Sequence, residues 1–255
     1  MLLETGLLLI FVAFILEYVD STLGMGYGTT LTPVLLLMGF EPLEIVPAAL
    51  VSQLAAGFLA AGMHHRVGNV DFKDHPYHLK IALFLGLLST LGAIFAVLVV
   101  LNLPQFYIRL YIGLLVAAMG IIIIWKRNHQ MSFSWPKIAG LGILASFNKG
   151  ISGGGYGPLV VTGQVFSGVS SKSAVAITSL AEGIACFVAI VLYYLSGAPV
   201  DWTLAPFLMI GAVFSAPMSA HTLKIIKENR LVLFIGGATI TLGIVTLINA
   251  LGLLS

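Results

Sequence analysis

Long runs of apolar residues, separated by short polar stretches, dominate this sequence. The long runs lie near residues 5–23, 43–63, 77–101, 104–125, 136–150, 171–196, 202–222 and 231–253. Two shorter runs, 29–39 and 158–167, each follow a glycine-rich stretch. A helix needs about 20 apolar residues to cross a bilayer, so the short runs reach only about halfway. The pattern predicts membrane-spanning helices and two short helices that follow breaks.

Four short motifs of the first half recur in the same order in the second half, which predicts an internal duplication. The pairs are "GYGTTL" (26–31) with "GYGPLV" (155–160), "GNVDF" (68–72) with "APVDW" (198–202), "GAIFA" (92–96) with "GAVFS" (211–215), and "RLYIGLLVAAMGI" (109–121) with "RLVLFIGGATITLGI" (230–244). We therefore expect two transmembrane repeats, residues 1–127 and 134–255, each with five apolar segments. A cytoplasmic linker at 128–133 would join them.

Lysine and arginine residues are unevenly distributed among the loops. They gather in 64–80, 126–137 and 224–230, whereas the loops near 102 and at 197–201 contain none. Cytoplasmic loops carry the excess of basic residues, so the first three loops are predicted to be cytoplasmic and the last two external. Equivalent loops of the two halves then lie on opposite sides of the membrane. That arrangement predicts inverted-topology repeats, with both chain ends outside.

The composition supports an all-α integral membrane protein. The 255 residues are 59% hydrophobic and only 9% charged, whereas soluble domains carry about 25% charged residues. A membrane β-barrel would show alternating polarity, which these continuous apolar runs lack. The formal net charge of +2 is spread over loops, so we expect the lipid bilayer, and no nucleic acid, as a partner.

The two glycine-rich breaks are the first candidate for chemistry. Irregular backbone at membrane depth is tolerated where it is buried in protein or lines a wet cavity. Free N–H groups at helix N-termini bind anions, and Pro158 stands where a first helical residue would. We therefore predict an anion site built from Gly26, Tyr27, Gly28, Thr29, Gly154, Gly155, Tyr156 and Gly157. The alternative is that these glycines only permit close helix packing.

The sequence resembles the TauE/SafE sulfite exporter family, also called the toluene sulfonate uptake permease family. The resemblance rests on "GMGYGTTLTPVLLLMGFEPLEIVPAALVSQ" (24–53), on "GISGGGYGPLVVTGQVFSGVSSKSAVAITSLAE" (150–182), and on the duplicated layout. It implies transport of sulfite or small organosulfonates across the bacterial cytoplasmic membrane. Members differ in substrate and direction, so the resemblance leaves both open.

Glu182 is the most distinctive polar residue, because it falls near the middle of an apolar run. A charge at that depth is costly, which marks it as a functional candidate. The repeat aligns Glu182 with Gln53, so one half carries a titratable group and the other its neutral isostere. We predict that Glu182 couples transport to protons and that Gln53 contacts substrate. The alternative is a protonated Glu182 that hydrogen-bonds between helices.

Other polar side chains near these levels are secondary candidates for binding substrate: Ser52, Asn148, Lys149 and Ser179. Lys149 would either face the anion or extend from a helix end toward water. Glu17 and Asp20 would form a gate with Lys149 or, as the favoured interpretation, a wet outer end of the first helix. The histidines near 64–78 are expected to be solvated, and no metal site is predicted.

These features together predict a secondary transporter that works by alternating access. No nucleotide-binding motif is present, so we expect no ATP and no other cofactor. A channel for the same anions is the nearest alternative. A membrane-embedded enzyme would need a nucleophile–base or metal constellation at membrane depth, and the sequence offers none, so we expect no enzyme activity. The sequence does not indicate an oligomeric state.

Overall fold

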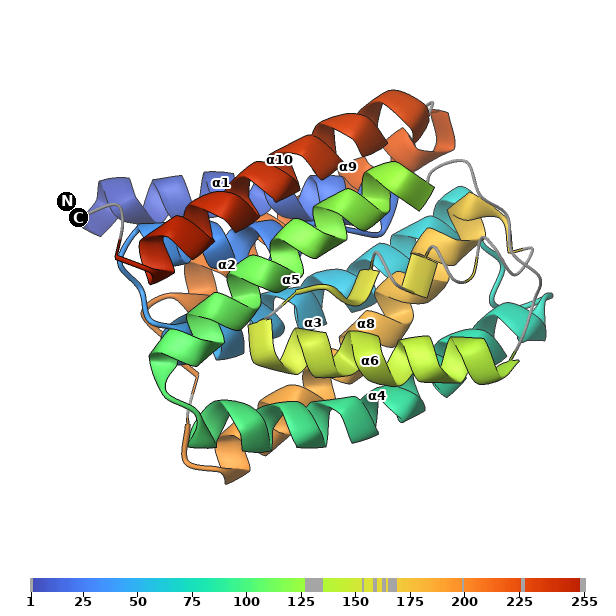
Figure 1. Cartoon of the computed structure of the whole chain (residues 1–255). Helices are drawn as coiled ribbons and strands as arrows, with labels where there is room; N and C mark the ends of the chain where they lie inside the picture. The colour runs from blue at the N-terminus through green and yellow to red at the C-terminus, as the bar shows by residue number, and fades with distance from the viewer. Residues whose placement is uncertain are drawn as a thin grey trace.

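The computed structural model describes residues 2–126, 135–152, 154–157, 160–161, 164, 169–198, 200–225 and 228–252. Within these residues all regular structure is helical, as predicted (Figure 1). The helices are α1 (Leu2–Leu23), α2 (Tyr27–Leu37), α3 (Pro42–Val67), α4 (Pro76–Asn102), α5 (Gln105–Lys126), α6 (Trp135–Ser152), α8 (Ser171–Leu195), α9 (Ala205–Ile225) and α10 (Glu228–Ala250). The predicted linker at 128–133 and most of the short run 158–167 lie outside the described residues.

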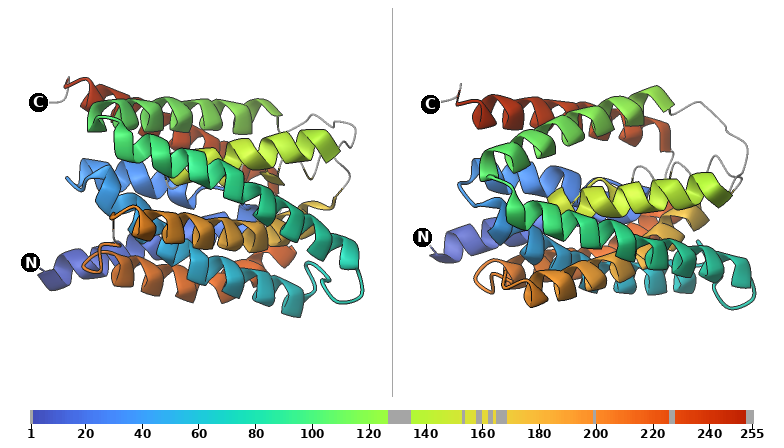
Figure 2. Two further views of the ribbon diagram at one scale, coloured as in Figure 1. Left: turned by 90° about the horizontal axis from the view of Figure 1, so that it is seen from below. Right: turned by 60° about the horizontal axis from the view of Figure 1, so that its bottom comes forward.

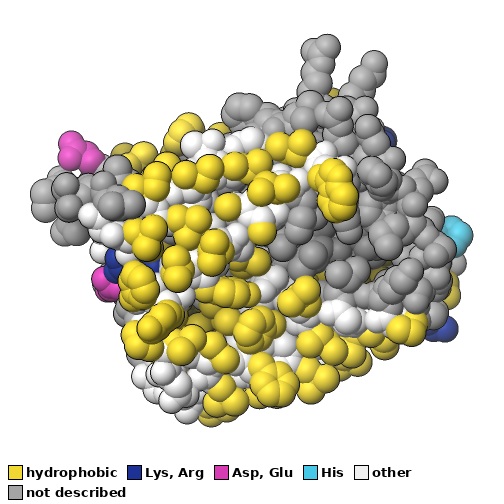
Figure 3. All heavy atoms as spheres, in the orientation of Figure 1, with side chains coloured by type: hydrophobic (Ala, Val, Ile, Leu, Met, Phe, Trp, Pro, Cys, Tyr) yellow, Lys and Arg dark blue, Asp and Glu magenta, His cyan; other side chains and the backbone are white. Residues whose placement is uncertain are grey.

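Five of the described helices are long and apolar enough to cross a bilayer: α1, α3, α4, α8 and α9. The exterior matches such an environment, because large apolar side chains such as Phe11, Leu87 and Phe214 are more than half exposed. In Figure 3, hydrophobic side chains cover the middle of the visible face, and the charged side chains lie toward its two ends. The chain is therefore a multi-pass membrane protein.

Local sequence signals set several helix ends. Glu41 and Glu44 form a reciprocal capping box at the start of α3, with Pro42 in the first turn, which satisfies otherwise unpaired N–H groups. Gly68 ends the same helix in the left-handed conformation, the usual glycine termination. At α8, the Ser170 side chain accepts a hydrogen bond from the Ser173 N–H. These caps define both ends of α3 and the start of α8, the helices that carry Gln53 and Glu182.

The long helices lie roughly alongside one another in Figures 1 and 2. Helix α3 packs against α8 and α9, and α4 packs against α6 and α8, while α1 packs on α9 and α5 on α10. If the predicted repeats are superimposed, α1 corresponds to α6, α3 to α8, α4 to α9 and α5 to α10. Exchange of the two halves then converts α3–α9 into α4–α8 and α4–α6 into α1–α9, and it leaves α3–α8 and α5–α10 unchanged. The packing therefore supports the duplication. The opposite orientation of the two repeats in the membrane stays a prediction.

Two glycines at equivalent places in the halves allow the closest helix contacts. A Cβ added at Gly92 of α4 would lie 2.3 Å from the carbonyl oxygen of Ile143 in α6. A Cβ at Gly211 of α9 would lie 2.2 Å from the carbonyl oxygen of Ile10 in α1. Neither distance is possible for a real side chain, so both contacts require glycine, as in other small-residue helix interfaces.

The connections rich in lysine and arginine lie at one end of the bundle, and two connections without such residues lie at the other end. The α3–α4 connection and the facing ends of α5, α6, α9 and α10 lie at one end, whereas α4–α5 and α8–α9 meet at the other (Figure 2). The start of α1 and the end of α10 also lie at that second end. The three connections expected to be cytoplasmic thus share one end, which we call the basic end.

Candidate substrate site

The two glycine-rich stretches cross each other in the interior of the bundle. A Cβ on Gly154 would lie 2.3 Å from the backbone nitrogen of Thr29, and a Cβ on Gly157 would lie 2.0 Å from the carbonyl oxygen of Gly24. Gly155 has a φ of 80°, which side-chain-bearing residues rarely adopt, and its N–H donates to Thr29 Oγ1 at 3.4 Å. The breaks meet backbone to backbone, so glycine is required for contact between the halves.

The first break is shorter than the sequence suggested. The short run after the first break was expected from residue 29, but α2 begins at Tyr27, with Gly26 at φ 130° as its N-cap. Tyr27, Gly28 and Thr29 therefore form the first helical turn, whose N–H groups have no acceptor within the helix. In the second half, Tyr156 and Gly157 are also helical, while Pro158 lies outside the described residues.

A carboxylate of the protein lies at the first of these free N–H groups. The Tyr27 N–H donates to Asp20 Oδ1 at 3.2 Å, and Asp20 is 6% exposed. A helix N-terminus favours negative charge through its partial positive charge. The helix start predicted after the first break is present, and Asp20 near the end of α1 supplies an acceptor for its first free N–H group; anion binding there stays a prediction.

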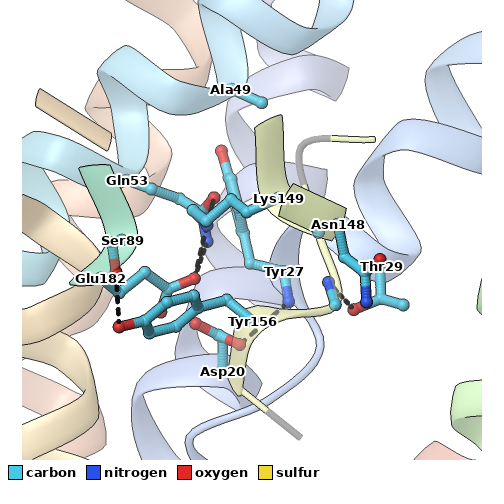
Figure 4. Close-up of polar contacts among 12 residues, drawn as sticks. Asp20, Tyr27, Thr29, Ala49, Gln53, Ser89, Asn148, Lys149, Tyr156 and Glu182 are labelled. Carbon is cyan, nitrogen blue, oxygen red and sulfur yellow. Dashed lines mark hydrogen bonds and ion pairs between the residues drawn. The ribbon is translucent and has the colours of Figure 1, made fainter. Parts of the chain in front are cut away.

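Lys149, Glu182 and Gln53 form a buried cluster at the centre of the site (Figure 4). The ammonium of Lys149 on α6 lies 2.5 Å from Glu182 Oε1 on α8 and 2.5 Å from Gln53 Oε1 on α3. Gln53 Nε2 donates to Glu182 Oε1 at 3.2 Å. The three side chains are 1%, 7% and 3% exposed, in the order Lys149, Glu182, Gln53. Such burial is tolerated because the charges are paired and hydrogen-bonded.

This cluster decides between two alternatives left open by the sequence. Gln53 and Glu182, aligned by the repeat, do lie together and bond to each other. Lys149 does not extend toward water; it points into the bundle and bridges the two halves through its contacts to α3 and α8. Its ammonium is paired with the Glu182 carboxylate, just as the Tyr27 N–H at the start of α2 is paired with Asp20.

The interpretation of Glu17 and Asp20 as a wet helix end is wrong. Glu17 is 3% exposed and accepts a hydrogen bond from Ser21 Oγ at 2.6 Å, while its Oε2 has no partner. Both carboxylates interact electrostatically with Lys149 and Glu182. Among the described residues three acidic side chains, Glu17, Asp20 and Glu182, and one lysine, Lys149, are buried, and of the three acids Glu182 contacts the lysine directly. Because an unpaired buried charge is very costly, protons must neutralise part of this cluster when it is closed.

Two tyrosines from the breaks are fixed by hydroxyl contacts. Tyr27 and Ser52 hydroxyls lie 2.7 Å apart, and Ser52 also donates to the Ala49 carbonyl. Tyr156 and Ser89 hydroxyls lie 3.2 Å apart. Ser89 was not a sequence candidate; a serine inside an apolar run was the only signal for it. Both tyrosines are fully buried and hold the two breaks against α3 and α4.

Asn148 and Ser179 were also predicted to bind substrate. Asn148 Oδ1 accepts a hydrogen bond from the hydroxyl of Tyr111 on α5, a residue that the sequence did not single out. Ser179 donates to the Val175 carbonyl one turn earlier, which is the ordinary intrahelical bond for a buried serine. Asn148 thus faces the second break from α6, whereas Ser179 makes no bond to the Lys149 cluster.

The histidines follow the expectation with one exception. His64 was expected in a solvated loop, but it lies in the last turn of α3, is fully buried, and bonds to the Ser21 carbonyl of α1 and to Asn69 after α3. Among the described residues no group of three or more histidine, cysteine or acidic side chains is placed to hold a metal ion.

A multi-pass helical bundle with broken helices and a buried charged cluster at their crossing is the arrangement expected of a membrane transport protein. The sulfite exporter TauE/SafE family model matches residues 9–246, so the chain belongs to this family of membrane transporters. The probable membrane transporter protein YtnM of Bacillus subtilis (strain 168) is 27% identical over 248 residues, which cover 94% of this chain and 81% of that protein. No solved structure matches the chain.

Proposed function

We propose that the protein is a secondary transporter of a small sulfur oxyanion or organosulfonate, such as sulfite or sulfoacetate, across the bacterial cytoplasmic membrane. The observation that carries the proposal is the buried Lys149 ammonium beside the crossed breaks. Together with the free N–H groups at the start of α2, it offers the donors that an oxyanion needs. The family and the name of the B. subtilis relative agree with transport of this kind.

Carboxylates of the protein hold these donors in the closed state. Glu182 is paired with Lys149, and Asp20 accepts from the Tyr27 N–H. An incoming sulfonate must displace at least one of them. A displaced carboxylate that stays buried cannot remain charged without a large cost, so it takes up a proton.

This competition links substrate to protons. When Glu182 is ionised, its negative charge neutralises Lys149 and repels an anion. When a proton binds to the Glu182 carboxylate, the ammonium is free to pair with a sulfonate oxygen, and the net charge of the cluster is unchanged. One proton would thus accompany each monoanion bound at Lys149, with Gln53 as a neutral hydrogen-bonding neighbour to both groups.

Burial of the whole cluster favours a carrier over a channel. Lys149, Glu182, Gln53 and both tyrosines of the breaks are each less than 9% exposed, so the site is closed to both sides. Substrate access then requires the helices to separate, and rocking of one half against the other at the glycine crossing would open the site to each side in turn. A channel would instead need a continuous path past this cluster.

The test is uptake of labelled sulfite and C2 sulfonates into proteoliposomes, with and without a pH gradient. We expect saturable flux that an imposed pH gradient accelerates in the wild type. Glu182→Gln should transport but lose the response to the gradient, because the amide cannot take up a proton. Asp74→Asn, which removes a carboxylate from the exposed α3–α4 connection, is the matched control and should keep the response.

Each result separates the alternatives. Flux that rises linearly with substrate concentration would support a channel. Sulfonate flux that ignores both the gradient and the substitution would make the protein a facilitator and remove the coupling role of Glu182. Absence of flux for every sulfonate tested would overturn the substrate class.

A further inference from the structure

His64 is buried in a turn whose neighbours are exposed. It is 0% exposed, whereas His65 and Arg66, which follow it on α3, face solvent. Its ring lies between α1 and the segment that follows α3: Nε2 is 2.9 Å from the Ser21 carbonyl oxygen, and Nδ1 is 2.9 Å from Asn69 Nδ2. Both ring nitrogens therefore have partners inside the protein.

These partners fix the protonation state of the ring. Asn69 Nδ2 also lies 2.8 Å from the Ala220 carbonyl oxygen, which can only accept, so the amide must present its NH₂ group there. The second hydrogen of that NH₂ points to His64 Nδ1, which must then be an acceptor. The proton sits on Nε2 and is donated to the Ser21 carbonyl, so the closed arrangement requires neutral His64.

The His64–Asn69 pair connects the two halves at the basic end. Ser21 belongs to α1 and His64 to α3, while Ala220 belongs to α9 in the second half. The Asn69 carbonyl also accepts from Ser173 of α8 at 3.4 Å. The Tyr18 and Thr222 hydroxyls, 2.7 Å apart, add a further contact between α1 and α9. Separation of the halves at this end must break the bonds of Asn69.

The aqueous side reaches the pair through a pocket of about 460 Å³ at the basic end. Asn69 and Ser173 contribute to its lining, together with His65, His75 and His78 of the α3–α4 region. A proton can therefore arrive at Asn69, on the side of the ring that carries the acceptor nitrogen.

We propose that His64 is a proton-binding site whose occupation opens the basic end of the transporter. Protonation of Nδ1 sets its N–H against the Asn69 NH₂, so that two donors face each other, and it adds a charge to a buried ring. Both effects disfavour the closed arrangement only. Neutral His64 holds the halves together, and the bond is lost as the pH at the basic end falls. The gating role rests on the proposed movement of the halves, but proton binding does not require a particular substrate.

Other charged groups near this end make no bond to the His64 ring, and His64→Gln leaves all of them in place. The groups on the elements around His64 are Glu17 and Asp20 of α1, His65 and Arg66 of α3, Asp71, Lys73, Asp74 and His75 of the following loop, His78 of α4, Lys172 of α8, and His221 and Lys224 of α9. Among the described side chains, only Asn69 bonds to the His64 ring. Backbone N–H groups of Asp74 and Lys73 hold the pKa of Asp71 below its usual value, so Asp71 stays charged throughout the range of interest.

A buried cysteine reporter on α9 tests the proposal. In a Cys186→Ala background, Ser219→Cys places a thiol at a fully buried position next to Ala220. Its labelling by a membrane-impermeant maleimide is compared, in liposomes without substrate, with that of His221→Cys, an exposed site on the same helix. The ratio of the two rates corrects for ionisation of the thiol.

We expect this ratio to rise about fourfold when the pH at the basic end falls from about 8 to about 6, because a histidine released from the closed arrangement, with the ordinary pKa of about 6.5, is mostly neutral at the higher pH and mostly protonated at the lower. His64→Gln, whose amide can donate to Ser21 and accept from Asn69 without titrating, should give a ratio that does not change with pH. A rise of equal size in His64→Gln would overturn the proposal.

Two more variants test the assigned tautomer and the independence of this gate from sulfonate coupling. Asn69→Asp replaces the amide donors by acceptors, so the closed arrangement then needs a proton, and the pH dependence should reverse. If the wild type shows the expected rise as the pH falls but Asn69→Asp shows no pH dependence, the assigned tautomer is wrong. Glu182→Gln should keep the wild-type rise, which distinguishes failure of this gate from failure of the proposed sulfonate coupling.

Discussion

Lys149 shows how strongly a single residue depends on its partners. It is 1% exposed, and both of its bonding partners come from other helices. Removal of one member of a buried pair leaves the other charge uncompensated, whereas replacement of both members by neutral groups is much less harmful. The pair is retained in a chain with few charges, which agrees with a role in transport and not in stability.

Lys149→Met is therefore expected to destabilise the protein by about 3–5 kcal/mol, because Glu182 loses its counter-charge. The double variant Lys149→Met with Glu182→Gln should recover most of that loss. Thermal unfolding in detergent, with wild type and both single variants measured side by side, checks this. Equal destabilisation in the single and double variants would mean that Lys149 acts through packing and not through its charge.

At the scale of residues, the sequence predicted a contact correctly where the internal repeat aligned two polar residues with each other. Gln53 and Glu182 were paired by alignment, and they bond in the structure. Asp20 and His64 were misplaced because their environment comes from other helices: Asp20 is covered at the start of α2, and His64 is enclosed by Ser21 and Asn69. The pattern of polar and apolar residues along the chain does not show which side chains other segments of the protein will bury.

At the scale of elements, the hydrophobic runs predicted most helices within a few residues. The run near 43–63 became α3 (Pro42–Val67), and the run near 202–222 became α9 (Ala205–Ile225). The exception is the first glycine-rich stretch, where the helix resumes directly after Gly26. The backbone conformation of Gly26, the N-cap, marks the point where the irregular stretch ends and α2 begins. Residues 26 and 28 are both glycine, so the sequence alone could not show which of them precedes the helix.

Gly92 and Gly211 provide a prediction about helix packing. Alanine at either position would place Cβ within 2.3 Å of a carbonyl oxygen on the facing helix, so α4 must separate from α6, or α9 from α1. We expect each substitution to lower the melting temperature by several degrees, as overpacking of about 1–3 kcal/mol would.

Gly140→Ala is the control for this comparison, because no atom of the residues that the structure describes lies within 4 Å of an added Cβ there. Its melting temperature should stay near that of the wild type. If Gly92→Ala and Gly211→Ala differ strongly from each other, the proposed equivalence of the two halves at these contacts would be wrong.

At the scale of the whole molecule, the basic connections lie together at one end of the bundle, and the ends of α1 and α10 lie at the other (Figures 1 and 2). Loop charge alone predicted this grouping. The crossing of the two glycine breaks could not be predicted in the same way, since it depends on contacts between residues more than a hundred positions apart.

The orientation can be tested with one cysteine at a time in the Cys186→Ala background, which removes the chain's single native thiol. We expect His75→Cys in the α3–α4 connection to react with an impermeant maleimide only when the cytoplasmic side is accessible. Thr203→Cys, in the α8–α9 connection, should react from outside in intact cells. The opposite pattern would invert the assigned orientation, and labelling of both from one side would contradict the bundle's two ends.

The carboxylates that fill the anion-binding groups have a consequence for the return half of the transport cycle. In the proposed transport cycle, Glu182 on Lys149 and Asp20 at the start of α2 satisfy, in the unloaded protein, the hydrogen-bond donors that the proposed substrate would otherwise satisfy. In such an empty carrier the charge of the Lys149 ammonium stays compensated during the conformational change, so the carrier can reorient without a counter-substrate. We therefore expect net movement of sulfonate down its combined gradient, and not an obligatory one-for-one exchange.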